Sequence, residues 1–286
     1  VILPLLETKG NNHGVDFFLC FSPERIDPGN KNYPVSKIPK VIGGISQEAG
    51  LLGSALYKNI VNKVVLVSST RVAEITKLLE NTFRIVNIGL IDELAMMACK
   101  MRIDIWEVIN AASTKPFGFM PFYPGPGVGG HCIPKDPLYL YWKAKKFGFK
   151  SRFIKLASDI ISYMPEYTVK RVEALLAGIG KRLRNSKILV LGATYKKDIK
   201  DLRQSPSLDI IRLLREKGSV VCYHDPIIPY LSIPEFNSKS LPLTKNNIAR
   251  FDCIIVATDH TNVDYNFVYK NSRLIFDTRN VYKSLS

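Results

Sequence analysis

Near the start of the chain, hydrophobic positions occur in short runs that predict strands. Residues 15–21, 40–44 and 64–67 are three such runs, bounded by polar residues and glycine. Short apolar runs with these boundaries are typical of buried strands, whereas the periodic spacing of residues 47–56 predicts a helix. Three strands and one helix make an incomplete α/β unit. We therefore expect residues 1–67 to be the C-terminal part of a domain.

A long helix is predicted next, over residues 71–101, which contain no proline. Apolar side chains recur there at three- and four-residue steps, the spacing of one face of a helix. Thr70 precedes the pattern and can cap the first turn. A helix of this length is typical of a bundle or a dimer interface. Further helices, which complete a helical domain over residues 68–183, are expected at residues 104–112, 138–147 and 154–178.

The pattern changes again in residues 184–286, where apolar runs alternate with a helical segment. A strand ending on Gly192, a helix and a second strand form one βαβ unit, and two more apolar runs follow. The predicted strands are residues 187–191, 220–223, 252–258 and 274–278, and the predicted helix is 207–217. The fold class is therefore α/β: a remnant of an N-terminal Rossmann domain, a central long-helix dimerisation domain and a C-terminal Rossmann-like domain with a parallel sheet.

A loop rich in proline and glycine is predicted at residues 115–136. A loop this long in a compact chain is usually functional. It contains the spacing GxGxxG at residues 125–130, but no strand precedes it and Pro134 blocks an immediate helix start, so it does not predict a dinucleotide site. These glycines more plausibly allow the backbone to approach a bulky ligand.

The formal charge of +15 has three readings: nucleic-acid binding, an anionic small substrate, or a lysine-rich surface that aids solubility. The basic residues are scattered rather than gathered in one stripe, which argues against nucleic acid. No run of residues is long and apolar enough to cross a membrane, and no secretion signal is visible.

Five cysteines without a CxxC pair argue against a disulfide framework and against a zinc site, and they suit a reducing cytoplasm. Four of them lie in apolar runs. Cys132 differs because it lies in the glycine-rich loop.

Three segments together resemble the UDP-glucose/GDP-mannose dehydrogenase family, in the same order and over nearly the whole chain. Residues 21–30 resemble the family's first substrate loop, residues 73–81 the start of its central helix, and residues 124–137 its cysteine loop. His131 and Ile133, which flank Cys132, make the chain most similar to UDP-N-acetylglucosamine 6-dehydrogenases. UDP-N-acetylmannosamine enzymes come next and UDP-glucose enzymes after them.

The resemblance implies an NAD-dependent, two-step oxidation of the C6 hydroxyl of a UDP-sugar to the uronate, for surface polysaccharide synthesis. Cys132 would hold the aldehyde as a thiohemiacetal and then as a thioester. Lys77 and Asn81 would flank the reacting oxygen, Asp136 would orient Lys77 or a water or accept a proton, and Glu24 would assist proton transfer or hydrolysis.

The resemblance also implies how the ligands are held. A homodimer formed through the central helix is expected, with no metal, no nucleic acid and no membrane. Lys135 and Arg203 would contact NAD. The residues implied to bind the UDP-sugar, with Lys197 as the alternative to Lys196, are Arg25, Phe122, Tyr123, Gly125, Gly127, Gly129, Lys196 and Arg279.

Two departures from the family pattern matter. Relatives specific for glucose carry a second Glu four residues after the one that matches Glu24, and Pro28 stands there in this chain. Family members also open with a complete NAD-binding Rossmann domain, and this chain starts about two-thirds of the way through it. We therefore expect the isolated chain to be inactive. The alternative is a UDP-sugar-binding dimeric fragment without catalysis.

Overall fold

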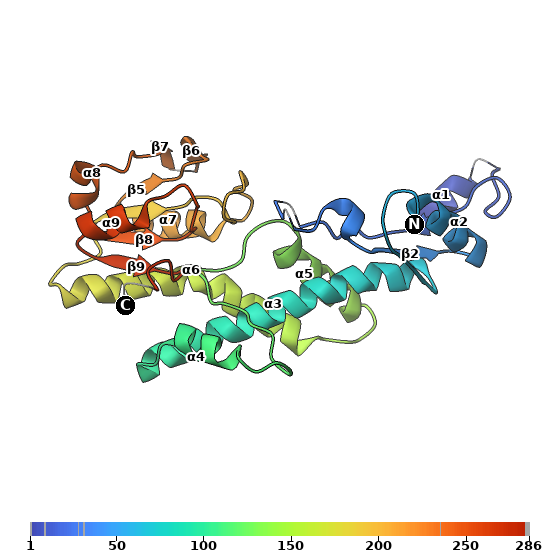
Figure 1. Ribbon diagram of the computed structural model, residues 1–286, viewed down its shortest axis with the longest axis horizontal. Coiled ribbons are helices and arrows are strands. Elements are labelled where there is room, and N and C mark those ends of the chain that lie inside the picture. The colour runs from blue at the N-terminus through green and yellow to red at the C-terminus, as the bar shows by residue number, and fades with distance from the viewer. Residues whose placement is uncertain (1, 9, 28, 31, 235, 284–286) are drawn as a thin grey trace. The chain divides into compact units, whose positions relative to one another are not determined.

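The computed structural model describes residues 2–8, 10–27, 29–30, 32–234 and 236–283, and Figure 1 shows its helices and strands. The chain divides into two compact units, residues 1–82 and 83–286. The boundary falls inside the helix α3 (Thr70–Met101). The three-domain division of the sequence stays a prediction.

The N-terminal unit contains a three-stranded sheet in the order β1-β2-β3. Strand β2 (Lys40–Gly44) pairs parallel with β3 (Val64–Val67) and antiparallel with β1 (Cys20–Phe21). Helix α2 (Gln47–Tyr57) connects β2 to β3, and the Ser46 side chain caps it by accepting from Ala49 N–H. The strands predicted at 40–44 and 64–67 and the helix between them are confirmed. The short helices α1 (Ile2–Glu7) and η1 (Val35–Lys37) were not predicted.

The strand predicted at residues 15–21 is wrong except for its last two residues. Val15 is 79% exposed, and the segment before β1 consists of turns. Asp16 Oδ2 accepts a hydrogen bond of 2.7 Å from Asn12 N–H, and Asp16 N–H donates to the Asn12 carbonyl over 2.9 Å. Local bonds of Asn and Asp side chains with nearby backbone compete with a strand ladder.

The long helix α3 begins at Thr70, and its cap is Ser69 rather than Thr70. Ser69 Oγ accepts a hydrogen bond of 3.3 Å from Val72 N–H, so the predicted cap was one residue late. Three more helices follow in the C-terminal unit: α4 (Ile105–Ala112), α5 (Cys132–Lys145) and α6 (Arg152–Gly178). A Cβ on Gly89 would lie 3.0 Å from Ala157 Cα, so this glycine lets α3 and α6 pack closely.

The C-terminal sheet has the order β5-β4-β8-β9, and every neighbouring pair is parallel. The predicted parallel-sheet domain is confirmed. A hairpin of β6 and β7 and two short helices were not predicted. The elements of this region are β4 (Lys187–Leu191), α7 (Pro206–Glu216), β5 (Val220–His224), β6 (Tyr230–Ile233), β7 (Phe236–Lys239), α8 (Lys245–Ala249), β8 (Cys253–Val256), α9 (Tyr265–Asn271) and β9 (Ile275–Asp277).

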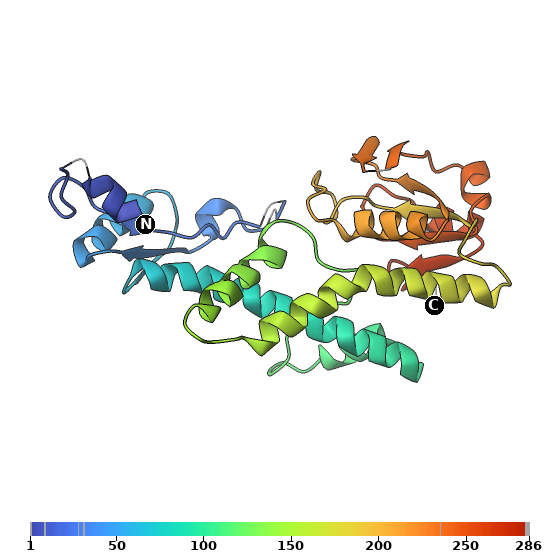
Figure 2. The ribbon, with the colours of Figure 1, turned by 180° about the vertical axis from the view of Figure 1, so that it is seen from behind.

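Helices cover both faces of this sheet. Ile188 and Val190 pack with apolar side chains of α6 and α7, whereas Leu189 and Leu191 pack with those of α8 and α9. Side chains of a strand alternate between faces, so four consecutive apolar residues supply both layers. Figure 1 and the reverse view in Figure 2 show α7 on one side of the sheet and α9 on the other.

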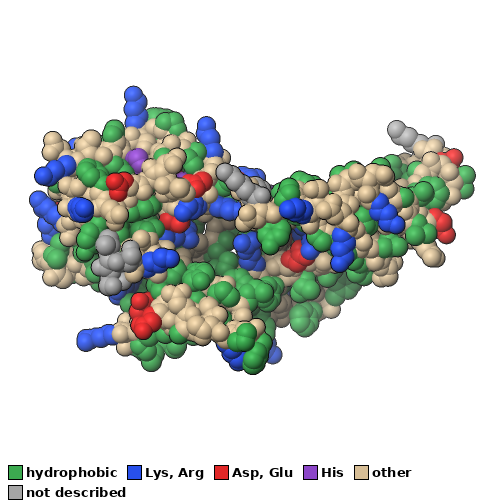
Figure 3. Space-filling model, in the orientation of Figure 1, with side chains coloured by type: hydrophobic (Ala, Val, Ile, Leu, Met, Phe, Trp, Pro, Cys, Tyr) green, Lys and Arg blue, Asp and Glu red, His purple; other side chains and the backbone are tan. Residues whose placement is uncertain are grey.

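In the part of the chain that the structure describes, no helix is long and apolar enough to span a membrane. On the face seen in Figure 3, Lys and Arg side chains lie among apolar and neutral ones rather than in a single stripe.

Candidate functional site

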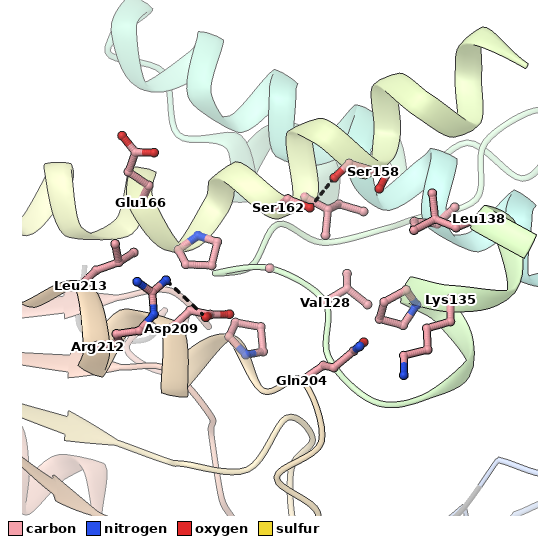
Figure 4. Close-up of a pocket in the computed structure, with 16 residues that line it drawn as sticks. Val128, Lys135, Leu138, Ser158, Ser162, Glu166, Gln204, Asp209, Arg212 and Leu213 are labelled. Carbon is pink, nitrogen blue, oxygen red and sulfur yellow. Dashed lines mark hydrogen bonds and ion pairs between the residues drawn. The ribbon is translucent and has the colours of Figure 1, made fainter. Parts of the chain in front are cut away.

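The C-terminal unit contains a pocket of about 710 Å³, bounded by α6, the start of α7, the start of α5 and the glycine loop. Figure 4 shows Lys135, Glu166, Asp209 and Arg212 around it, together with the apolar Val128. Its volume is in the range of about 300–1,000 Å³ that is usual for small-molecule sites. Of the residues predicted to act, Gly127 and Lys135 line this pocket.

The glycine loop packs against the protein's own segment 192–206. A Cβ on Gly127 would lie 3.2 Å from Pro206 Cγ, and one on Gly129 would lie 2.6 Å from the Gln204 carbonyl oxygen. Gly130 N–H donates a hydrogen bond of 2.8 Å to the Arg203 carbonyl. These glycines therefore let the loop pack closely against another segment of the same chain. The predicted approach to a ligand stays a prediction.

Cys132 is the first residue of α5, which corrects the prediction that Pro134 prevents a helix start. The first N–H groups of a helix have no acceptor inside the helix, so a proline in the first turn removes no hydrogen bond. No strand lies in residues 113–131, so the rejection of the glycine pattern as a dinucleotide turn does not depend on the helix start. A half-buried thiol at the start of a helix lies where negative charge is favoured.

His131 Nδ1 lies 4.0 Å from Cys132 Sγ. The side chains of these two neighbours therefore lie close together rather than pointing apart. His131 is the N-cap residue of α5, and Cys132 is the first residue of the helix. Asp136, one turn further along α5, is half-buried.

Two predicted residues of the loop make aromatic contacts inside the C-terminal unit. The ring of Phe122 packs edge-on against Phe83 at 5.8 Å, and Tyr123 stacks on Trp106 at 5.5 Å. Tyr123 remains 48% exposed. These contacts fix the course of the loop before its glycines.

Gly125 is held between two charged residues. Its N–H donates a hydrogen bond of 3.0 Å to Asp92 Oδ1, and a Cβ on it would lie 3.1 Å from an Arg279 guanidinium nitrogen. Arg279 Nε also donates to the Ala257 carbonyl over 2.8 Å. Burial lowers the pKa of Arg279, and the carboxyl groups of Asp259, Asp92 and Asp277 oppose that effect.

The turn that carries Lys196 is anchored by a buried polar network at the carboxyl ends of β4, β5 and β8. Asp225 Oδ2 accepts hydrogen bonds from Ala193 N–H (2.7 Å) and Thr194 N–H (3.3 Å), and it lies 3.1 Å from His260 Nε2. Asp198 N–H bonds to His260 Nδ1 over 3.1 Å. Burial opposes ionisation of Asp225, but these partners outweigh it and lower its pKa to about 2.

Three basic residues predicted near ligands lie on or beside this turn. Lys196 is half-buried, whereas Lys197 is exposed and forms an ion pair of 3.5 Å with Asp259. Arg203 is exposed, and its guanidinium donates three hydrogen bonds to the Asp201 carboxylate, at 2.6 Å, 3.0 Å and 3.0 Å. The hydrogen bond from Arg203 lowers the pKa of Asp201.

In the N-terminal unit, two predicted residues bond to neighbouring charges. Lys40 Nζ lies 2.8 Å from Glu24 Oε2, and Arg25 pairs with Glu80 at 2.6 Å and donates to the Pro39 carbonyl at 2.9 Å. Burial alone would raise the pKa of Glu24, but its hydrogen bonds, the one from Lys40 first among them, outweigh that effect and lower it. The lowered pKa keeps Glu24 ionised at neutral pH, so that it cannot donate a proton there.

Lys77 and Asn81 are both half-buried and lie one turn apart on α3. Residues four apart on a helix share a face. Pro28 lies outside the described residues.

Sequence reasoning missed Asp92, Asp225 and His260. Asp225 gave a signal, because it directly follows the strand β5, and ligands of parallel sheets bind at the carboxyl ends of the strands. Asp92 also gave a signal in the sequence, because it is an acidic residue that directly follows the apolar Ile91 in a predicted helix.

Within the described residues, no group of three or more His, Cys, Asp and Glu side chains could hold a metal ion. A smaller pocket of about 340 Å³ lies at the carboxyl ends of β2 and β3, beside the start of α2. Its position suits part of a dinucleotide site. The described residues of this chain do not supply the strand, glycine turn and helix that bind the pyrophosphate, and so they fit NAD only in part.

Comparison with known proteins gives a consistent result. Residues 71–161 match the central domain of the UDP-glucose/GDP-mannose dehydrogenase family, and residues 189–284 match its UDP-binding domain. A UDP-N-acetyl-D-mannosamine dehydrogenase of Methanococcus maripaludis is 32% identical over 272 residues, which are 92% of this chain and 61% of the relative. A UDP-N-acetyl-D-glucosamine 6-dehydrogenase of Pseudomonas aeruginosa is 39% identical over 226 residues, which are 78% of this chain and 53% of the relative.

Among solved structures, the UDP-D-ManNAc dehydrogenase of Pyrococcus horikoshii superposes with a TM-score of 0.85 at 32% identity. The match covers 97% of this chain and 65% of that one. The chain thus spans less than two-thirds of the length of these relatives.

Proposed function

Because the chain belongs to the UDP-glucose/GDP-mannose dehydrogenase family, we propose that the whole protein oxidises the C6 hydroxyl of a UDP-sugar to the carboxylate in two NAD-dependent steps. The product would serve surface polysaccharide synthesis. The observation that carries the proposal is the placement of Cys132 at the first position of α5, directly after the glycine loop. All five cysteines are free, which fits the reducing cytoplasm in which we propose that the protein works.

We propose UDP-N-acetylglucosamine as the substrate, with UDP-N-acetylmannosamine as the runner-up and UDP-glucose after it. His131 and Ile133 beside Cys132 support this order. Relatives that bear each of the first two names match the chain.

The proposed task of Cys132 is to hold the intermediate aldehyde. Its Sγ attacks C6, a sulfur–carbon bond forms, and the carbonyl oxygen takes up a proton to give a thiohemiacetal. The second oxidation converts this adduct to a thioester. Water then attacks C6, the sulfur–carbon bond breaks, and the products are a carboxylate and the free thiol. NAD+ would accept both hydrides in the whole protein.

Four other residues assist in this proposal. Lys77 stabilises the negative charge that develops on the C6 oxygen, and Asn81 positions that oxygen or a water. Asp136 orients Lys77 or a water, or accepts a proton. Glu24 acts as a base in proton transfer or thioester hydrolysis, in keeping with its lowered pKa.

The UDP moiety would bind to the C-terminal unit. Lys196 and Arg279 supply positive charge for the diphosphate, and the anchored turn at the carboxyl ends of β4 and β8 holds Lys196 in place. The glycine loop and Arg25 complete the sugar-nucleotide site, whereas Lys135 and Arg203 contact NAD.

A homodimer through the central helix is part of the proposal. In the C-terminal unit, α3 presents Phe83, Leu90, Met97 and Met101, each about half exposed, at spacings that place them on one face. A groove of about 480 Å³ lies between this face and the loop residues Phe119 to Phe122. A second copy of α3 would cover these apolar side chains.

The rival proposal is a UDP-sugar-binding dimer without catalysis. Calorimetric titration of the 286-residue chain, with UDP-sugar and separately with NAD+, tests it. Binding of UDP-sugar alone, without turnover, favours the rival for this chain. Turnover of UDP-sugar with NAD+ at a rate typical of enzymes, about 1 s⁻¹ or more, refutes it.

The mechanism is tested with Cys132→Ser in a complete protein that contains this chain. Uronate formation should fall by about a thousandfold or more, because a hydroxyl is a far weaker nucleophile than a thiolate. Cys222→Ser, at a half-buried position in β5, is the matched control and should retain activity. Unchanged uronate formation by Cys132→Ser refutes the mechanism.

A further inference from the structure

Asp92 is a buried carboxyl group with one oxygen that no described residue bonds. The residue is fully inaccessible to solvent, one carboxyl oxygen accepts the hydrogen bond from Gly125 N–H, and the other, Oδ2, has no hydrogen-bond partner among the described residues. An unpaired buried oxygen is unfavourable, and more so if it is charged. Such a group is rare in native proteins and calls for an explanation.

The charge that acts on Asp92 comes from Arg279. Burial raises the pKa of Asp92 to about 7, against the opposing effects of the Gly125 hydrogen bond and the positive charge of Arg279. Asp259 and Asp277 act on Arg279 as well. Three carboxyl groups thus act on Arg279. Its guanidinium also lies close to Gly125 in the proposed substrate loop, since a Cβ on that glycine would be 3.1 Å from a guanidinium nitrogen.

We propose that Asp92 is a proton-linked positioning residue for the sugar nucleotide. In its neutral form it holds Gly125 and leaves the charge of Arg279 to the diphosphate, and in its ionised form it competes with the diphosphate for that charge. The proposal rests on the proposed function, in which Arg279 binds the diphosphate.

In this arrangement, binding of the diphosphate is coupled to protonation of Asp92. When the diphosphate neutralises Arg279, the carboxylate of Asp92 loses its one favourable charge partner, and its proton affinity rises. Binding above neutral pH must then take up a proton at Asp92. The affinity for the UDP-sugar therefore falls as pH rises, by at most about tenfold per pH unit for one linked proton.

The test is calorimetric titration of the 286-residue chain with UDP-N-acetylglucosamine, whose diphosphate is esterified at both ends and does not titrate near neutral pH. Titrations between about pH 6 and 9, each in two buffers of different ionisation enthalpy, give the affinity and the number of protons taken up. Asp92→Asn keeps an acceptor for Gly125 N–H but cannot ionise. Glu93→Gln, the exposed neighbour on the same helix, is the matched control.

We expect the wild type and Glu93→Gln to bind more weakly as pH rises and to take up protons. Asp92→Asn should show neither effect and should bind more tightly than the wild type at the highest pH. Binding by Asp92→Asn with the wild-type pH slope and proton uptake overturns the inference alone. Failure of the wild type to bind at any pH overturns the proposed function as well. Circular dichroism at each pH separates loss of affinity from loss of folding.

Discussion

The N-terminal and C-terminal sheets both contain parallel strands, but helices bury the side chains of the two sheets to different extents. In the C-terminal sheet, Leu189 lies in the middle of β4 with helices over both faces and is 0% exposed. In the N-terminal sheet, Leu66 lies in β3, pairs with Ile42 of β2 and is 46% exposed. Ladder hydrogen bonds are present in both. The packing of helices, and not strand pairing, therefore decides how much apolar area each sheet buries.

The largest expected effect comes from shortening the same side chain in the two sheets. Leu189→Ala should lower the free energy of unfolding of the C-terminal unit by about 2–5 kcal/mol, because it leaves a cavity in a closed core. Leu66→Ala should lower that of the N-terminal unit by less, about 1 kcal/mol, since half of the side chain already contacts water. Hydrogen exchange measured on peptides from β3 and β4 reports each unit separately. Equal losses at the two positions would contradict the comparison.

The two sheets also differ in the buried hydrogen bonds at their carboxyl ends, and this difference should appear as a loss of stability at low pH. At the carboxyl edge of the C-terminal sheet, Asp225 accepts four backbone hydrogen bonds and contacts His260. Its folded pKa of about 2 lies below the ordinary aspartate value of 3.8, so its stabilisation is complete above about pH 4 and is lost as pH falls toward 2. The difference corresponds to about 2 kcal/mol.

Asp225→Asn should therefore destabilise the C-terminal unit at neutral pH, and the gap to the wild type should narrow in acid. Urea unfolding at several pH values measures it. Asp209→Asn, an exposed control on α7, should show little change at any pH. If the difference in free energy of unfolding between Asp225→Asn and the wild type does not vary with pH, the Asp225 side chain stabilises the unit by packing and not by its charge.

The C-terminal sheet could be predicted from sequence because several of its strands are continuous apolar runs, which are typical of a sheet covered on both faces. The hairpin β6–β7 and helices α8 and α9 were missed because four to seven residues are too few to show a period. Residues 15–19 were wrongly predicted as strand, since Asp16 and Asn12 form local hydrogen bonds that hydrophobicity does not report.

The site was predicted in part. The loop motif pointed to Cys132, but its position in a helix was missed because Pro134 was read as a helix breaker rather than as a first-turn residue. The partners of the glycines were missed for another reason. Gly129 and Gly130 approach residues 195–204, more than sixty positions along the chain, and no local pattern encodes a contact of that range.

The smallest expected effect lies in the N-terminal unit, in the ion pair of Glu24 and Lys40. Lys40 is nearly buried but the Glu24 side chain is 55% exposed, so solvent screens the pair, and Glu24→Gln should change the stability of the unit by less than about 1 kcal/mol. The pKa of Glu24 is lowered. The small stabilisation is thus present above the usual glutamate pKa, and it disappears as pH falls through the lower folded value.

The same variant in a complete protein separates structure from catalysis. If Glu24 acts as a base, uronate formation should fall by about a hundredfold or more while hydrogen exchange in β2 stays close to that of the wild type. Glu48→Gln, at an exposed position on α2, should leave both measurements unchanged. A loss of uronate that appears only together with faster exchange in β2 would make Glu24 a structural partner of Lys40.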